Sequence, residues 1–344
     1  MSNSSPDLSR RDFFKVSAAA IATVGVANFL KPSYATEVNV KTVALSNLPK
    51  APVEVAKSSE LVQKAWDYLL GEINSLHDLA LREKVFSFYQ NTVPTFMEQH
   101  QGSANISKVY KMLLQEHLVD PALTDEAHLF PPLKDLNINP QPFFSAPGSG
   151  YGSHHAYPGG LATHTAVNVE ITKSILTTYS HIMDYEYGYD MAVAGQLLHD
   201  LAKPWVFQWN KDGSCMKEYS IAGTGAHHIF SIAEAIYRGM PADEVVAQAC
   251  AHNHPGTPKD EELVVGWIKA ASILACVDPI ERGLLDKEVV AKDYGMNDKE
   301  LEGEKFNIFR NYIASQYSFM HIHQAMSEAD PYLAVKAIAK KVVS

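Results

Sequence analysis

The 344-residue sequence has only three cysteines, which excludes a disulfide scaffold as its main source of stability. It also lacks an excess of basic residues, because 29 lysines and arginines stand against 39 aspartates and glutamates. A net charge of −10 disfavours binding along a phosphate backbone, so no long nucleic acid is expected as a partner. Alternating apolar and polar residues are scarce, and no internal repeat is visible. These absences favour an all-α fold.

Long hydrophobic runs are also missing. The uncharged run 16–30 falls short of the roughly 20 residues that a membrane-spanning helix needs, so no stable membrane insertion is expected. It follows the basic stretch "SRRDFFK" and precedes small residues at Ser33 and Ala35, a pattern typical of a twin-arginine export signal. An uncleaved anchor is the alternative. We therefore expect a signal at 1–35, the twin-arginine translocase as a partner during export, and a periplasmic or otherwise exported protein with a net charge near −12.

Helical periodicity organises most of the remaining chain. It runs from Ser59 to Tyr89, with Ser58 or Ser59 as the cap, and returns at 106–117. Segment 130–153 is rich in proline and glycine and cannot hold a long helix, so it marks a boundary. Four or five helical patterns follow, and two more lie in the tail. The expected regions are an N-terminal helical region at 36–145, a metal-binding domain at 146–290 and C-terminal helices at 291–344 that pack on that domain.

One histidine stands out by its helical phase. Leu161, His164, Asn168, Ile171 and Ile175 are spaced alternately by three and four residues. This spacing places His164 on the inward face of a helix that begins just after a Gly-Gly pair. A lone histidine there is more often a core residue than a ligand, so the interpretation depends on its partners.

Later segments supply such partners. Each places an imidazole or a carboxylate near the end of an apolar helical pattern, and a buried carboxylate is costly unless it is paired or binds a cation. In the last pattern, Ile268, Ala271 and Ala275 lead at helical spacing to Asp278. The candidates are His199 and Asp200, His227 and His228, His252 with His254 just past its helix, and Asp278.

At this point the residues resemble a known family. His164, then His199-Asp200, then a distal Asp278 match the H…HD…D signature of HD-domain metal-dependent phosphohydrolases. The stretches "HHAYPGGLATHT" and "LLHDLAK" are especially similar to the HD domain of HD-type 3′–5′ exoribonucleases. The resemblance covers roughly 150–285. One departure is Ala202-Lys203-Pro204, where many relatives have Gly-Lys, so the lysine is kept but the turn after it differs.

The resemblance implies an HD-like helical bundle, with additional helices at both ends, and a ligand set for one or two metal ions. The first position would use His164, His199, Asp200 and Asp278. A second position would add two histidines, one from each of two pairs. In the first pair His227 is narrowly preferred over His228, and in the second pair His252 is preferred over His254. His254, His154 and His155 would then lie on the substrate side. Asp200 and Lys203 would carry catalysis, with Lys203 binding a substrate phosphate or pairing with a carboxylate.

This ligand set also points to a class of metal and of reaction. Imidazole and carboxylate ligands without thiolate suit a divalent transition metal such as Fe, Mn, Zn, Ni or Co. A bridging Asp200 would hold two ions about 3.5–4 Å apart, as in hydrolases that act on phosphoesters. The expected function is hydrolysis of a nucleotide or another small phosphorylated substrate. An HD-type di-iron oxygenase and a non-catalytic metal-binding sensor are the alternatives.

Overall fold

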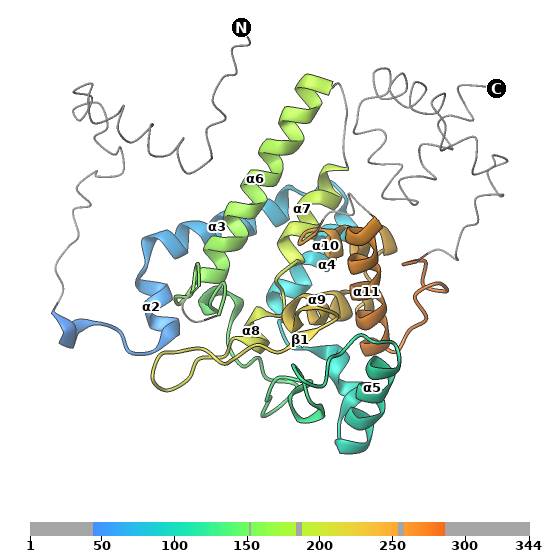
Figure 1. The fold of residues 1–344 in the computed structure, drawn as a ribbon. Coiled ribbons are helices and arrows are strands. Elements are labelled where there is room, and N and C mark those ends of the chain that lie inside the picture. Colours follow the sequence, from blue (N-terminus) through green and yellow to red (C-terminus); the bar gives the residue numbers. More distant parts are fainter. Residues whose placement is uncertain (1–43, 151–152, 184–187, 254–257, 286–344) are drawn as a thin grey trace, which may run out of the picture. The chain divides into compact units, whose positions relative to one another are not determined.

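The computed structural model describes residues 44–150, 153–183, 188–253 and 258–285 (Figure 1). The predicted export signal and the predicted helices of 291–344 lie outside these residues, as does His254. The chain divides into two compact units between Leu48 and Pro49. Every element discussed below belongs to the second unit, except the 3-10 helix η2 (Leu45–Asn47).

The described residues are mostly helical, which confirms the predicted all-α class. The two short strands β1 (Ser220–Ile221) and β2 (Thr224–Gly225) form one antiparallel hairpin. Within the described ranges, no helix is both long enough and apolar enough to cross a membrane. The α-helices are α2 (Pro52–Ser58), α3 (Glu60–Ser75), α4 (Leu79–Gln90), α5 (Ser103–Gln115), α6 (Gly160–Met183), α7 (Tyr189–Leu198), α8 (Lys203–Val206), α9 (Ala226–Tyr237), α10 (Ala242–Cys250) and α11 (Pro258–Leu274). The other 3-10 helices are η3 (Thr95–His100), η4 (Glu126–His128) and η5 (Phe143–Ser145).

Local capping sets the boundaries of the first long helices. The side chain of Ser59 accepts a hydrogen bond from the backbone N–H of Val62, as expected for the N-cap of α3. The predicted periodicity from 59 to 89 is interrupted, because Asp78 caps a new helix, α4, by accepting from the N–H groups of Ala80 and Leu81. One periodic stretch therefore becomes two helices that turn at Leu76–Asp78.

A single apolar core joins the parts of the chain on both sides of segment 130–153. Helix α9 packs against α10 and α11, α7 packs against α6 and α10, and α3 crosses and packs against α6 (Figure 1). The largest fully buried side chains include Phe88, Phe143, Trp205 and Phe230, which come from both halves of the chain. The boundary at 145/146 thus stays a prediction. The core that supports the later helices is formed by residues on both sides of that boundary.

The predicted apolar stripe of α6 is buried only in the first part of the helix. Leu161 is fully buried, but Ile171 and Ile175 are 52% and 48% exposed. The C-terminal half of α6 extends away from the other helices (Figure 1). Periodicity indicates which face of a helix is apolar, but it does not ensure that another element covers that face. His164 is positioned because it lies in the first turns of α6, where the helix is packed.

Candidate metal centre

Two glycines set the start of the helix that carries His164. Gly159 has a φ of +86°, and a Cβ there would lie 2.4 Å from the side chain of Val62. A Cβ on Gly160 would lie 1.8 Å from the carbonyl oxygen of His155. A side chain at Gly159 would clash with α3, and one at Gly160 would push the loop that carries His155 away from the start of α6. Gly160 therefore permits the close approach of the His155 loop to the helix that carries His164.

The histidine–aspartate pair lies in the turn between α7 and α8. His199 and Asp200 are 3% and 1% exposed. Nδ1 of His199 lies 2.6 Å from the carbonyl oxygen of Gln196 and must donate to it, because a carbonyl can only accept. The turn is held to α9 by a hydrogen bond of 3.0 Å from the N–H of Ala202 to Oγ of Ser231. These contacts direct Nε2 of His199 at the centre of the site.

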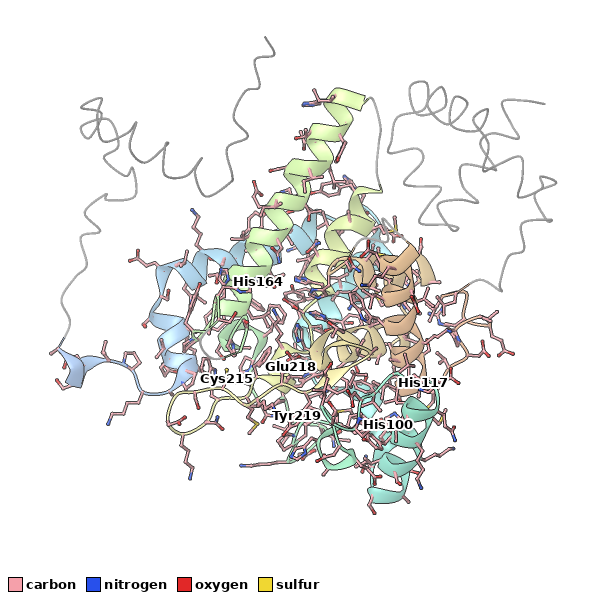
Figure 2. The ribbon with its side chains drawn as sticks, viewed as in Figure 1. His100, His117, His164, Cys215, Glu218 and Tyr219 are labelled. Atoms are coloured by element: carbon pink, nitrogen blue, oxygen red, sulfur yellow. The ribbon has the colours of Figure 1, made fainter. Side chains whose placement is uncertain are left out.

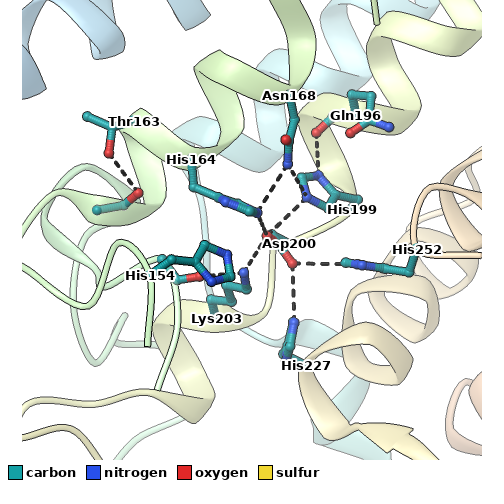
Figure 3. A network of polar contacts seen from close by, with 12 residues as sticks. His154, Thr163, His164, Asn168, Gln196, His199, Asp200, Lys203, His227 and His252 are labelled. Atoms are coloured by element: carbon teal, nitrogen blue, oxygen red, sulfur yellow. Dashed lines mark hydrogen bonds and ion pairs between the residues drawn. The ribbon is translucent and has the colours of Figure 1, made fainter. Parts of the chain in front are cut away.

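Asp200 stands between two pairs of imidazoles (Figure 3). Its Oδ2 lies 3.0 Å from Nε2 of His164 and 3.0 Å from Nε2 of His199. Its Oδ1 lies 3.2 Å from Nε2 of His227 and 3.6 Å from Nε2 of His252. Two helices, α6 and α9, and the turns that follow α7 and α10 thus direct imidazoles at one buried carboxylate, which is the convergence that the sequence predicted for these five residues.

Both members of the pair at the start of α9 reach the site. One ligand atom from each of Asp200, His227, His228 and His252 lies within 4.8 Å of the others, and a second such group contains His164, His199 and Asp200. His228 stacks on His252, with ring centroids 3.4 Å apart, and its Nδ1 lies 2.6 Å from Oγ1 of Thr224. The structure therefore includes His228 beside the preferred His227, and Asp200 is common to both groups.

Lys203 is buried beside the same carboxylate. Its Nζ lies 2.6 Å from Oδ2 of Asp200 and 2.5 Å from the carbonyl oxygen of Gly148, and the residue is 5% exposed. Of the two predicted roles, pairing with a carboxylate is the one that this geometry shows. Since the side chain also lines the cavity above the site, its charge adds to the field that a bound anion would meet.

Sequence reasoning missed two residues that contact the imidazoles. Glu218, in the segment before β1, accepts hydrogen bonds from the backbone N–H of His227 and from its Nδ1. No periodic signal links Glu218 to His227, although the absence of a Cβ at Gly225 lets the carboxylate approach. Asn168 directs its side-chain amide at His164, with Nδ2 3.1 Å from Nε2. Asn168 lies one helical turn after His164, and this spacing is the sequence signal that could have identified it.

The electrostatics of the site favour an ionised Asp200 beside neutral imidazoles of His164 and His252. Burial alone would raise the pKa of Asp200, but the charges of His199 and Lys203 hold it well below its usual value. Burial lowers the pKa of His164 and that of His252, the latter to about 3. Neutral imidazoles are the form that binds metals.

His227 behaves differently from the other imidazoles. Burial would lower its pKa, but the charge of Glu218 and the contact with Asp200 raise it above its usual value. A carboxylate on Nδ1 increases the basicity of the opposite nitrogen, as in carboxylate–histidine–metal arrangements.

The residues present fit a metal ion. Oδ1 of Asp200 and Nε2 of His252 are buried and have no hydrogen-bonding partner among the described residues, whereas Oδ2 of Asp200 pairs with Lys203. Oδ1 of Asp200 and Nε2 of His252 lie 3.6 Å apart across the site. Acceptors that converge in a buried site need a cation between them. The donor set of imidazole and carboxylate suits a divalent transition metal, whose identity the residues do not specify.

A cavity of about 620 Å³, here called the metal cavity, opens above the cluster. His154 and His164 line it, together with Lys203 and His252. The rings of His154 and His155 each lie 5.3 Å from the ring of His164. Both histidines thus lie beside the predicted ligand, but of the two only His154 lines the metal cavity.

The structure does not bring Asp278 to the cluster. Helix α11 ends at Leu274, and the N–H groups of Cys276 and Val277 close a Schellman-type turn on the carbonyls of Ile273 and Ser272. Cys276 has a φ of +57°, so the chain leaves the helical path before Asp278. The exposed carboxylate of Asp278 instead accepts the N–H groups of residues 280 and 281. The prediction of Asp278 as a ligand assumed that helical phase continued through this turn, and the described geometry contradicts that assumption.

Replacement of Glu218 by glutamine tests the role of the carboxylate behind His227. We expect metal affinity to fall about 10- to 100-fold, the usual cost of losing such a partner, because the amide cannot sustain the basicity of Nε2. Metal titration against a chelator of known affinity measures the change, and Glu83→Gln on the exposed face of α4 is the matched control. Equal affinities of Glu218→Gln and the wild type would show that His227 does not bind the ion.

No family model matches the chain, and no solved structure matches it. Among curated proteins, it is 28% identical over 115 residues to a dihydroneopterin 2′,3′-cyclic phosphate phosphodiesterase of Methanocaldococcus jannaschii. The match covers 33% of this chain and 45% of that protein, so the chain spans less than half the length of this relative. The similarity and the histidine–aspartate cluster are both consistent with the HD-like arrangement that the two sequence motifs imply.

Proposed function

We propose that the protein is a metal-dependent phosphohydrolase that cleaves a small phosphoester after export through the twin-arginine pathway. The observation that carries the proposal is the position of Asp200, which directs one oxygen at His164 and His199 and the other at His227 and His252. A carboxylate in this position suits a bridge between two ions, a recurrent arrangement in enzymes that act on phosphoesters.

A bound divalent transition metal supplies Lewis acidity, which activates water as a nucleophile and polarises a phosphoryl oxygen. The chain contributes the rest. Asp200 and the imidazoles orient the cation, and Lys203 brings a positive charge to the wall of the metal cavity. His154, beside His164 in that wall, is placed to contact a phosphoryl oxygen or the leaving group. No serine or cysteine nucleophile is needed.

The similarity to a cyclic-phosphate phosphodiesterase favours phosphodiesters over phosphomonoesters. The test is a panel containing a phosphomonoester, a linear phosphodiester and a 2′,3′-cyclic phosphodiester, assayed after loading with Fe, Mn, Zn, Ni or Co. We expect turnover of the cyclic diester with at least one metal, and its loss on dialysis against a chelator. Absence of turnover with every metal, or turnover that consumes O₂, would contradict the proposal.

Export is tested separately. Expression of the full chain in a bacterial host with and without a functional twin-arginine translocase should place the protein in the periplasm only in the first case. Replacement of Arg10 and Arg11 by lysine should have the same effect as loss of the translocase. Periplasmic protein in the strain without the translocase would contradict this part of the proposal.

A further inference from the structure

Three histidines near the start of α6, here called the outer cluster, lie together on one side of the centre at Asp200. His154 and His155 lie in the turn before the helix, and His164 lies where α6 enters the body of the molecule (Figure 2). One ligand nitrogen from each of the three lies within 4.8 Å of the other two. His154 and His252 lie on opposite sides of Asp200 (Figure 3). The outer cluster is therefore distinct from the two pairs of imidazoles that face Asp200, although His164 belongs to both.

The three rings of the outer cluster are arranged as ligands of one ion. The centroids of His154 and His155, of His154 and His164, and of His155 and His164 are all 5.3 Å apart. Imidazole nitrogens bind Zn²⁺ at about 2.0–2.1 Å, so two imidazoles on one tetrahedral ion have ring centres about 5 Å apart. None of the three pairs is stacked, because their planes are inclined by between 50° and 82°. An equilateral triangle of unstacked rings is the arrangement that three imidazoles adopt around one cation.

The loop before α6 holds His155 against the other two rings. His155 has a φ of +57°, and its carbonyl oxygen accepts a hydrogen bond of 2.9 Å from the N–H of Gly148. The missing Cβ of Gly160 lets the same carbonyl approach the first turn of the helix. Nδ1 of His155 is buried and has no hydrogen-bonding partner in the described ranges. Burial of such a nitrogen is costly, and a cation bound there would compensate that cost.

The ligand types and the exposure of the outer cluster indicate which ions it would take. His154 is exposed, and His155 and His164 are half-buried, whereas His199 and Asp200 are buried. Three imidazoles without a carboxylate suit Zn²⁺ or Cu²⁺ and disfavour Mg²⁺ and Ca²⁺, which prefer oxygen ligands. A site with three imidazoles keeps an open position for water or an anion. Since His154 also lines the metal cavity, that open position is accessible from the cavity.

His164 links the outer cluster to the centre at Asp200. A neutral imidazole has one unprotonated nitrogen and therefore binds one ion at a time. Nε2 of His164 lies 3.0 Å from Oδ2 of Asp200, so an ion in the outer cluster competes with that contact. The two positions are thus coupled through one side chain.

We propose that His154, His155 and His164 form a separate outer site for a divalent transition metal such as Zn²⁺ or Cu²⁺. An ion in this site draws His164 away from Asp200 and occupies the place where His154 would contact a substrate. Excess metal is therefore bound at the wall of the metal cavity, in addition to the ions held around Asp200. The inference goes beyond the proposed hydrolysis and is decided by metal binding alone.

The first test counts the Zn²⁺ ions bound to the full chain at equilibrium, by dialysis against a high and constant concentration of free Zn²⁺. We expect the wild type to bind one ion per chain more than His155→Asn, since asparagine tolerates a left-handed backbone but lacks the imidazole. The matched control is His117→Asn. His117 is exposed, has the same φ of +57° and lies apart from His164 (Figure 2). It should bind as many ions as the wild type.

A second test isolates the outer site with Asp200→Asn, which is expected to lose the centre at Asp200. Cu²⁺ is added without later dialysis, because a solvent-accessible site without a carboxylate releases its ion readily. We expect one Cu²⁺ per chain whose electron paramagnetic resonance spectrum shows coupling to imidazole nitrogens. Adding His155→Asn should abolish this signal, whereas adding His252→Ala, on the opposite side of Asp200, should leave it unchanged.

The outcomes separate this site from the proposed function. Equal numbers of Zn²⁺ ions in the wild type and in His155→Asn would overturn the outer site, as would loss of the additional ion in His117→Asn. Loss of the Cu²⁺ signal on adding His252→Ala would assign the ion to the centre at Asp200 and would also overturn it. If the additional ion binds as expected but no phosphoester is cleaved, the proposed function fails and the outer site stands.

Discussion

Asp200→Asn is expected to remove metal binding at both positions and to lower kcat/KM by at least about 10³-fold. The expected size follows because Lewis-acid catalysis contributes several kcal/mol and each 1.4 kcal/mol, roughly, is a factor of ten. The amide cannot supply two anionic oxygens to the two pairs of imidazoles that face Asp200. Metal content after dialysis and activity on the cyclic phosphodiester are the two measurements.

Asp278→Asn is the matched comparison for this variant. The same substitution at an exposed carboxylate that only accepts backbone N–H groups should leave metal content and activity unchanged. Loss of metal in Asp278→Asn would show that the resemblance was right about this residue and that α11 continues further than described. Full metal content in Asp200→Asn would contradict the assignment of the centre itself.

Stability should also respond to Asp200→Asn. Lys203 is 5% exposed and would lose the charge that compensates its own, a loss that typically costs about 3–5 kcal/mol in a buried pair. Urea unfolding of the chelator-treated proteins separates this effect from the loss of bound metal. Retained far-UV circular dichroism would confirm that the variant is folded when its metal content is measured.

Glu244→Gln is expected to increase stability at neutral pH. Glu244 lies in the first turn of α10, is 3% exposed, and its Oε1 has no hydrogen-bonding partner in the described part of the chain. Burial, reinforced by the charges of Asp243 and Asp190, raises its pKa to about 9. The carboxyl group is therefore protonated in the folded protein at pH 7, whereas in the unfolded chain it ionises near its ordinary pKa.

The sign of the effect follows from this difference. Between the ordinary pKa of a glutamate and about 9, the folded state binds one more proton than the unfolded state, so the free energy of unfolding falls as pH rises. Glutamine is neutral and similar in shape, and it removes this dependence. At pH 7 we expect the variant to be more stable by on the order of 3 kcal/mol, and at pH 4 the two proteins should be alike.

Denaturant unfolding at pH 4, 5.5, 7 and 8 provides the measurement, with Glu83→Gln as a control at an exposed glutamate. Because Glu244 lies in the first turn of α10 and His252 follows the other end of that helix, we expect the metal to contribute equally to both proteins and to cancel in the difference. Parallel stability curves for Glu244→Gln and the wild type would show that the carboxyl group is solvated or paired, contrary to the described burial.

Short-range features of the fold were predictable because their causes are local. Ser59 caps α3 through its own hydroxyl, and the Gly-Gly pair starts α6 at the expected place. The second cap, Asp78, was equally local but lay inside a continuous periodic stretch, so the break it causes was missed. The end of α11 was missed for another reason, since a left-handed Cys276 closes it where glycine would be the usual signal.

The metal centre was predictable as a set of residues but not as an arrangement. Helical phase and the resemblance together identified His164, His199 and Asp200, and the structure brings them together. They could not choose between His227 and His228, because neighbouring helical positions point only about 100° apart and both can reach one ion. Glu218 carried no signal, since its contact with His227 depends on how the hairpin folds back before α9.

The sequence by itself determined the helical class, the local helix starts and the residue types that can hold a metal, because these depend on the spacing and chemistry of neighbours along the chain. Only the tertiary structure decided that Asp200 lies between two pairs of imidazoles, that Asp278 lies apart, and that the three rings of the outer cluster form a triangle. The physical reason is that the convergence of side chains from α6, from α9 and from the turns that follow α7 and α10 depends on how the buried faces of these helices pack, and periodicity within each helix does not contain that information.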